Sequence, residues 1–176
     1  MEPGDEAVDV FLDPGDWFVG HAGFRIRTVL GSCVSIALWH PRARVGGMSH
    51  FLLPTRGAPA GRNELDGRYG DEALLLLLGQ FRLAGLRAAD FVAKVFGGGN
   101  MFADQAVARH MAVGHRNGEA ARALLQAHGI RIVSESLYGF GHRQVIFDVD
   151  SGDVWVRQVP PALVDAAVAR DADLRR

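Results

Sequence analysis

The chain has one cysteine, Cys33, which follows a Gly-Ser pair in the stretch TVLGSCVSIALWHPRARVGGMSHFLLP. A free thiol has a pKa of about 8.5, so it becomes an effective nucleophile when a neighbouring base removes its proton. His50, near the end of the same stretch, is the candidate base, and its imidazolium can protonate a departing amine. Gly31 allows close approach to the backbone, and amides around Ser32 and Cys33 can stabilise an oxyanion. The pattern indicates cysteine-dependent hydrolysis.

The two side chains can meet if the segments that carry them form a β-hairpin around the turn sequence HPRAR. Pairing Cys33 directly with His50 places the hairpin centre between Pro41 and Arg42, and opposed residues have Cβ atoms about 4.5–5.5 Å apart. Pro41 fixes a negative φ and does not suit a two-residue primed turn. A longer loop would shift this pairing by a residue or two.

A buried, structural cysteine is the alternative interpretation, because free cysteine is among the residue types most often found in cores. A single histidine is also more often structural than catalytic. The Gly-Ser pair before Cys33 and the expected position of His50 bring the two interpretations to about equal weight. A triad would need a third group to orient the imidazole, and Thr28 is a candidate by nearness alone.

The whole chain has the composition of an ordinary globular protein, with 176 residues, 48% of them hydrophobic and 22% charged. We expect a single domain over 1–176, with a core at about 8–159 and a peripheral helical tail at 160–176. The net charge of −1 offers no basic excess for nucleic acid or anionic lipid. The longest apolar run, 73–79, is shorter than the roughly 18 residues that suggest a membrane span. With no basic signal-peptide start and a lone free thiol, we expect a cytoplasmic protein.

Hydrophobic periodicity predicts an α/β fold, a layered sandwich around a mixed or antiparallel sheet. Asp71 is expected to cap the first helix and Asn117 the second, with Gly129 as the C-terminal stop of the second. Strands are expected at 8–12, 23–29, 33–39, 45–53, 90–97, 130–139, 143–152 and 153–159, and helices from 71 to about 85 and from 117 to 129.

Several sequence blocks resemble one known family, the chemoreceptor glutamine deamidases called CheD. The blocks are LGSC, GGM, HFLLP, RYGDEALLLLL, AKVFGGGNMF, VGHRN and RQVIFDVDSGDVWVRQV, in this order. The resemblance implies an α/β/α sandwich related to deamidating bacterial toxins. It also implies hydrolysis of receptor glutamine side chains to glutamate with release of ammonia, with no metal or cofactor. Its nucleophile falls on Cys33 and its base on His50. Thr28 is the threonine that completes the family triad, with Arg27 as the neighbour that a one-residue shift would select.

The implied partners are methyl-accepting chemotaxis receptors and, in some bacteria, the phosphatase CheC. Two other functions remain open: a non-catalytic or dual-function module that docks to receptors or to the phosphatase, and a cysteine amidase or esterase acting on small molecules. The segment FGGGNMF lacks the lysine of a phosphate-binding loop, so we interpret it as a close backbone approach beside the site. The remaining histidines show no zinc-binding spacing, so no metal site is expected.

Overall fold

The computed structural model describes residues 6–57, 64–101 and 107–160. The strands are β1 (Val8–Leu12), β2 (Trp17–His21), β3 (Phe24–Leu30), β4 (Val34–His40), β5 (Val45–Ser49), β6 (Val92–Gly97), β7 (Arg131–Leu137), β8 (His142–Asp148) and β9 (Val154–Val159). The helices are α1 (Gly70–Leu83), α2 (Val107–Ala127) and a short 3-10 turn at Ala88–Asp90. The expected tail helix falls on 161–176, outside the described residues.

The strands form two sheets. One has the order β2-β5-β4-β6-β7 and is antiparallel except for the parallel pair β6 and β7. The other has the order β1-β3-β8-β9 and is antiparallel except for the parallel pair β1 and β3. The expectation of mixed sheets in an α/β fold is therefore confirmed.

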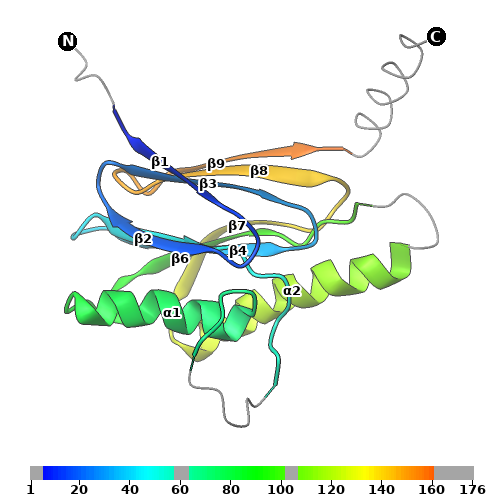
Figure 1. The fold of residues 1–176 in the computed structure, drawn as a ribbon, viewed down its shortest axis with the longest axis horizontal. Helices are drawn as coiled ribbons and strands as arrows, with labels where there is room; N and C mark the ends of the chain where they lie inside the picture. Colours follow the sequence, from blue (N-terminus) through cyan, green and yellow to red (C-terminus); the bar gives the residue numbers. More distant parts are fainter. Residues whose placement is uncertain (1–5, 58–63, 102–106, 161–176) are drawn as a thin grey trace.

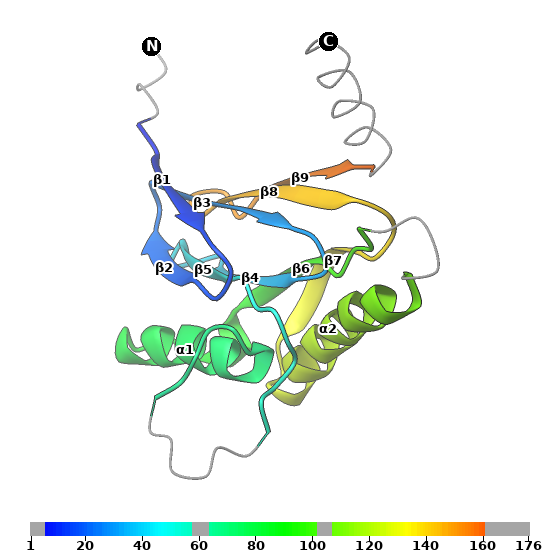
Figure 2. The same ribbon diagram turned by 45° about the vertical axis from the view of Figure 1, so that its right-hand side comes forward.

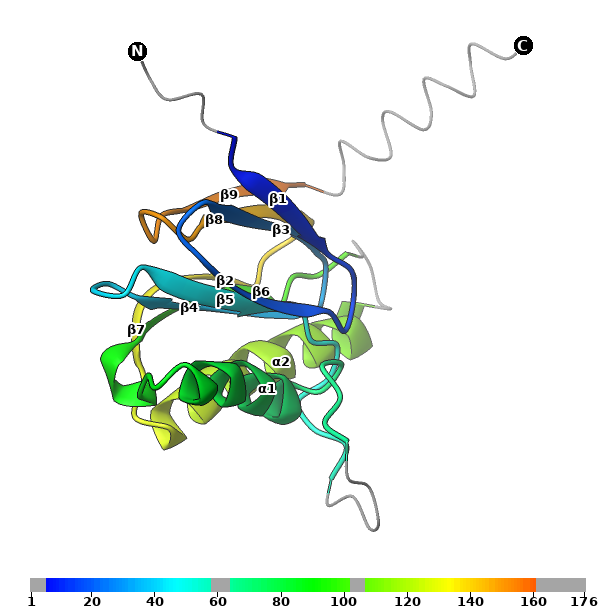
Figure 3. The ribbon, with the colours of Figure 1, turned by 60° about the vertical axis from the view of Figure 1, so that its left-hand side comes forward.

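The layers run from helices to the five-stranded sheet to the four-stranded sheet, as Figure 1 and the rotated views in Figures 2 and 3 show. Both described helices cover the same face of the five-stranded sheet, and the four-stranded sheet covers the other face. The described layers therefore differ from α/β/α, because a second sheet stands where the second helix layer was expected. Each face of the five-stranded sheet is buried, which explains why β4 is apolar almost throughout.

Helix α1 buries one stripe of the leucine-rich segment against the five-stranded sheet. Leu74, Leu77, Leu78 and Phe81 recur at helical spacing and are buried, whereas Leu75 is exposed. The N-cap prediction for Asp71 is wrong, because the cap position is Tyr69 and Asp71 lies in the first turn. There its carboxylate accepts hydrogen bonds from the Glu72 amide and the Thr55 hydroxyl, at 2.9 and 2.7 Å.

Helix α2 begins earlier than the sequence suggested. It runs over Val107–Ala127, so Asn117 lies in its middle and is not a cap. Gly129 does end the helix, with a left-handed φ of 69° and the Ile130 amide bonded back to the Leu125 carbonyl. The missed first half carries Gly114, whose lack of a side chain allows the helix to lie directly against the backbone of Gly98.

Strand β2 was also missed by the sequence analysis. It pairs with β5 along its whole length, with Val19 opposite Gly47. The glycines of β5 explain why this pairing is possible, since a Cβ on Gly47 would lie 2.8 Å from the Phe18 carbonyl oxygen. A weak period-two pattern in a five-residue edge strand left little signal in the sequence.

Candidate active site

Strands β4 and β5 form the expected hairpin, but in a different register. His40 pairs with Val45 across a four-residue turn, which includes Arg44 at a φ of 51°. Beyond β5 the same register continues to Val34 and Phe51, which exchange two backbone hydrogen bonds of 3.1 and 3.0 Å. The predicted direct pairing of Cys33 with His50 is therefore wrong. Its physical reason is the turn, which is longer than the symmetric arrangement allowed.

The shift preserves the face on which the two residues lie. Extending the pairing of Val34 with Phe51 places Cys33 opposite Leu52 and His50 two positions away, as a diagonal neighbour of Cys33. Because side chains alternate with a period of two, a two-residue shift leaves them on the same side of the sheet. Cys33 packs against the core between the two sheets, and the buried His50 ring reaches a residue of the four-stranded sheet. Diagonal neighbours have Cα atoms about 7–8 Å apart, within reach of an imidazole.

Thr28 is the residue of the four-stranded sheet that contacts the His50 ring. Its hydroxyl lies 2.7 Å from Nδ1 of His50, and both residues are 2% exposed. The same hydroxyl donates its hydrogen to the Leu12 carbonyl at 2.8 Å. A hydroxyl has one hydrogen, so Oγ1 must accept from Nδ1–H of His50. This assigns the tautomer of a neutral His50, with Nε2 unprotonated and able to accept a proton.

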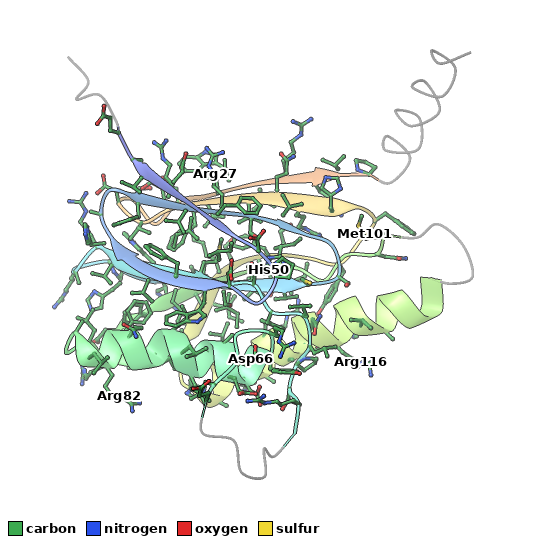
Figure 4. The ribbon with its side chains drawn as sticks, viewed as in Figure 1. Arg27, His50, Asp66, Arg82, Met101 and Arg116 are labelled. Atoms are coloured by element: carbon green, nitrogen blue, oxygen red, sulfur yellow. The ribbon has the colours of Figure 1, made fainter. Side chains whose placement is uncertain are left out.

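Arg27, the alternative to Thr28, faces the other way. Its guanidinium is paired with Asp9 at 3.3 Å on the outer side of the four-stranded sheet. Figure 4 shows Arg27 on that outer side and His50 in the interior. The geometry brings Thr28, and not Arg27, to the imidazole.

The backbone of His50 is fixed by the turn between β1 and β2. Its amide donates to the Asp16 carbonyl at 3.0 Å, and its carbonyl accepts from the Gly15 amide at 2.8 Å. Burial lowers the pKa of His50 below 6.5, while the Leu12 carbonyl and the carboxylates of Asp16 and Asp13 oppose that shift. The contact of this turn with His50 was not predicted, although the segment DPGD is a strong turn signal.

Cys33 is partly buried, and burial raises the pKa of its thiol above 9.0. Its own backbone N–H acts in the opposite direction, since this donor lies against the sulfur and stabilises the thiolate. Burial thus favours the uncharged form of both Cys33 and His50. With both groups uncharged, proton transfer would accompany attack on a substrate.

The glycine triplet supports the Cys33 segment from the side, as expected. The Gly98 amide donates to the Cys33 carbonyl, and the Gly99 amide donates to the Gly31 carbonyl, both at 2.9 Å. Gly97 has a φ of 113°, and a Cβ there would lie 2.2 Å from the Cys33 carbonyl oxygen. Only a residue without a side chain fits this approach.

One apolar side chain lies at the surface beside Gly31. Met101 is partly exposed and packs over Gly31, where a Cβ would meet its side chain at 3.2 Å. Met48 and Phe51 are fully buried and belong to the core. An apolar pocket beside the triplet is lined by Gly98, Asn100, His115, Tyr138, Gly139 and Phe140.

Neither a cluster for a metal ion nor a membrane-spanning helix is found in the described ranges. No three side chains among their His, Cys, Asp and Glu residues converge on one point. No described helix combines the length and apolar character that a bilayer crossing requires.

Comparison with known proteins decides the family. The profile described as "CheD chemotactic sensory transduction" matches residues 52–158. This chain belongs to the CheD family. The match begins just after His50, and similarity to curated CheD proteins extends further toward the N-terminus, since it covers 90% of this chain in one of them.

Three curated CheD proteins illustrate the similarity. "Probable chemoreceptor glutamine deamidase CheD 2" of Albidiferax ferrireducens is 57% identical over 90% of this chain and 92% of its own length. CheD 1 of Chromobacterium violaceum is 46% identical over 94% and 84%, and CheD 3 of Dechloromonas aromatica is 46% identical over 86% and 88%. Among solved structures, the YfiH protein of Bacillus licheniformis is 16% identical over 69% of this chain and 50% of its own, with a TM-score of 0.41.

Proposed function

We propose that this CheD chain is a protein-glutamine deamidase that hydrolyses glutamine side chains of methyl-accepting chemotaxis receptors to glutamate and ammonia. Its curated relatives carry the name chemoreceptor glutamine deamidase. The observation that carries the proposal is the 2.7 Å contact of the Thr28 hydroxyl with Nδ1 of His50, on the face that also holds Cys33. A base of fixed tautomer beside a thiol is what amide hydrolysis by cysteine requires.

The first half of the reaction forms a thioester. Nε2 of His50 takes the thiol proton as Cys33 Sγ attacks the side-chain carbonyl carbon of the glutamine. The carbonyl oxygen becomes negatively charged, and the Cys33 amide is the donor that would stabilise it. His50 then gives its proton to the departing nitrogen, so the C–N bond breaks and ammonia leaves.

The second half returns the enzyme to its resting state. His50, neutral again, removes a proton from a water molecule, and the water oxygen attacks the thioester carbon. The C–S bond breaks, and the Cys33 sulfur recovers a proton from His50. The product is a glutamate side chain on the receptor. Each step uses Nε2, because Nδ1 stays bonded to Thr28 throughout.

The test is conversion of purified receptor cytoplasmic fragments, followed by peptide mass spectrometry. Wild-type protein is expected to add about 1 Da at each converted glutamine, and the Cys33→Ala variant is expected to add none. Conversion by Cys33→Ala at the wild-type rate would overturn the assignment of the nucleophile. Release of ammonia from free glutamine without receptor conversion would favour a small-molecule amidase.

The remaining parts of the proposal concern location and partners. A protein that modifies receptor cytoplasmic regions acts in the cytoplasm, where a free thiol stays reduced. A CheC-type phosphatase partner is proposed from the family resemblance. Normal chemotaxis in a strain carrying Cys33→Ala would favour the docking-module function.

A further inference from the structure

Asn117 is a polar side chain buried where α2 meets the loop that carries Cys33. It is 0% exposed. Its Nδ2 donates to the Ser32 carbonyl at 3.0 Å and to the Leu52 carbonyl at 2.8 Å. Because both partners are carbonyl oxygens, only the NH₂ group can face them, which settles the orientation of the side-chain amide. One residue therefore joins the segment before Cys33 to the segment after His50.

This clamp lies at the end of the strand ladder between the two segments. The last backbone pair is Val34 with Phe51, and beyond it the Leu52 amide turns away to the Arg68 carbonyl. The side chain of Asn117 takes the place of the next backbone hydrogen bonds at the point where the segments separate. The spacing of Cys33 and His50 thus depends on a residue from a third element.

The helix can reach this position because it packs closely on the glycine triplet. Gly114 lies one turn before Asn117 on the same face, and a Cβ there would be 2.6 Å from the Gly98 carbonyl oxygen. Gly98 in turn donates to the Cys33 carbonyl. The carbonyls on both sides of the Cys33 amide, those of Ser32 and Cys33, are thereby held, one by Asn117 and the other by Gly98.

The Ser32 carbonyl and the Cys33 N–H belong to one planar peptide group. In a trans peptide these two groups point in opposite directions, so a fixed carbonyl also fixes the direction of the N–H. With the carbonyl held toward α2, the Cys33 N–H points away from the helix. That N–H is the donor available to an oxyanion formed when the sulfur attacks a carbonyl carbon.

We propose that Asn117 is a positioning residue that orients the Ser32–Cys33 peptide so that the Cys33 amide serves as an oxyanion-hole donor. The inference rests on the proposed role of Cys33 as nucleophile. Asn117 touches neither the substrate nor the reacting atoms. Its effect should be far larger in reactions that pass through an oxyanion than in reactions of the same thiol that do not.

Asn117→Asp tests this directly, because it keeps the shape of the side chain and removes both donors. Acylation of Cys33 by p-nitrophenyl acetate forms an oxyanion, whereas alkylation by iodoacetamide does not. Because both reactions use the thiolate, the ratio of the acylation rate to the alkylation rate is expected to be roughly 100-fold lower in the variant than in wild type. Asn117→Ala, which adds no charge, is expected to show the same contrast if the aspartate variant does not fold.

Gln126→Glu is the matched control, since it makes the same amide-to-carboxylate change at an exposed position of α2. It should leave both rates unchanged. Wild-type acylation by a folded Asn117 variant would overturn the proposal, and so would equal losses of acylation and alkylation, which indicate a purely structural role. The ester assay needs no receptor, so failure of wild type to convert receptors would count against the proposed function alone.

Discussion

The Thr28 hydroxyl accepts a hydrogen bond from Nδ1 of His50 at 2.7 Å and donates its own hydrogen to the Leu12 carbonyl. The directions of these two hydrogen bonds are fixed, since the Leu12 carbonyl can only accept. The neutral imidazole is therefore held with Nε2 free on the face shared with Cys33. The relationship joins the two sheets at the point where the proposed chemistry occurs.

Thr28→Val should disrupt this arrangement with little change in volume. Without the hydroxyl, both tautomers of His50 become accessible, and kcat for receptor deamidation is expected to fall roughly 100-fold. Thr28→Ser keeps the hydroxyl and is expected to stay within about fivefold of wild type. Deamidation kinetics of the two folded variants provide the measurement, and an equal loss in both would contradict the role of the hydroxyl, because Thr28→Ser retains it.

The alkylation of Cys33 should depend on pH as expected for a thiol of raised pKa. Burial raises this pKa above 9.0, so the thiolate fraction of the free enzyme keeps rising beyond that pH. The rate of modification by iodoacetamide is expected to increase from pH 7 to above about pH 9 without reaching a plateau. A plateau below about pH 8 would instead indicate a resting thiolate–imidazolium pair.

The stability of the protein should fall in mild acid through His50. Burial lowers its pKa in the folded protein below 6.5, so on acidification the unfolded chain takes up this proton first. Above about pH 6.5 both states are neutral at this residue, and it adds no pH dependence. As pH decreases below that value, the free energy of unfolding decreases until the folded histidine is protonated as well.

Urea unfolding at about pH 7.5 and pH 5.5 measures this contribution. The decrease between the two pH values should be smaller in His50→Gln than in wild type. His128→Gln, at an exposed position, is the control and should retain the full decrease. An unchanged decrease in His50→Gln would contradict the assignment.

Two glycine-to-alanine changes should have opposite effects. At Gly97 a Cβ would lie 2.2 Å from the Cys33 carbonyl oxygen, and the φ of 113° is unfavourable for alanine. Gly97→Ala is therefore expected to destabilise the fold by more than about 1 kcal/mol and to reduce deamidation. Gly79→Ala, inside α1 with no atom within 4 Å of the new Cβ, should stabilise by up to about 1 kcal/mol and leave activity unchanged. Denaturant unfolding and receptor conversion provide the comparison.

The structural position of Asn117 could not be predicted from the sequence. Its residue type and the glycine beside it resemble a helix start, and local pattern cannot separate a cap from a buried asparagine in mid-helix. What distinguishes them is the position of the Ser32 and Leu52 carbonyls, which come from distant parts of the chain. Similarly, the register predicted at Cys33 was wrong because a symmetric turn was assumed. The sequence HPRAR alone does not select the four-residue turn that the structure shows.

The sequence by itself determined the residue types with chemistry to offer and most of the strands. The predicted shared face of Cys33 and His50 holds because the actual register shift is two residues, which side-chain alternation tolerates. Only the tertiary structure decided that Thr28 rather than Arg27 meets the imidazole, because that choice depends on how two separate sheets stack. It also placed α2 against the Cys33 loop and the four-stranded sheet over β4. These contacts join residues far apart in the chain, and local propensity carries no information about them.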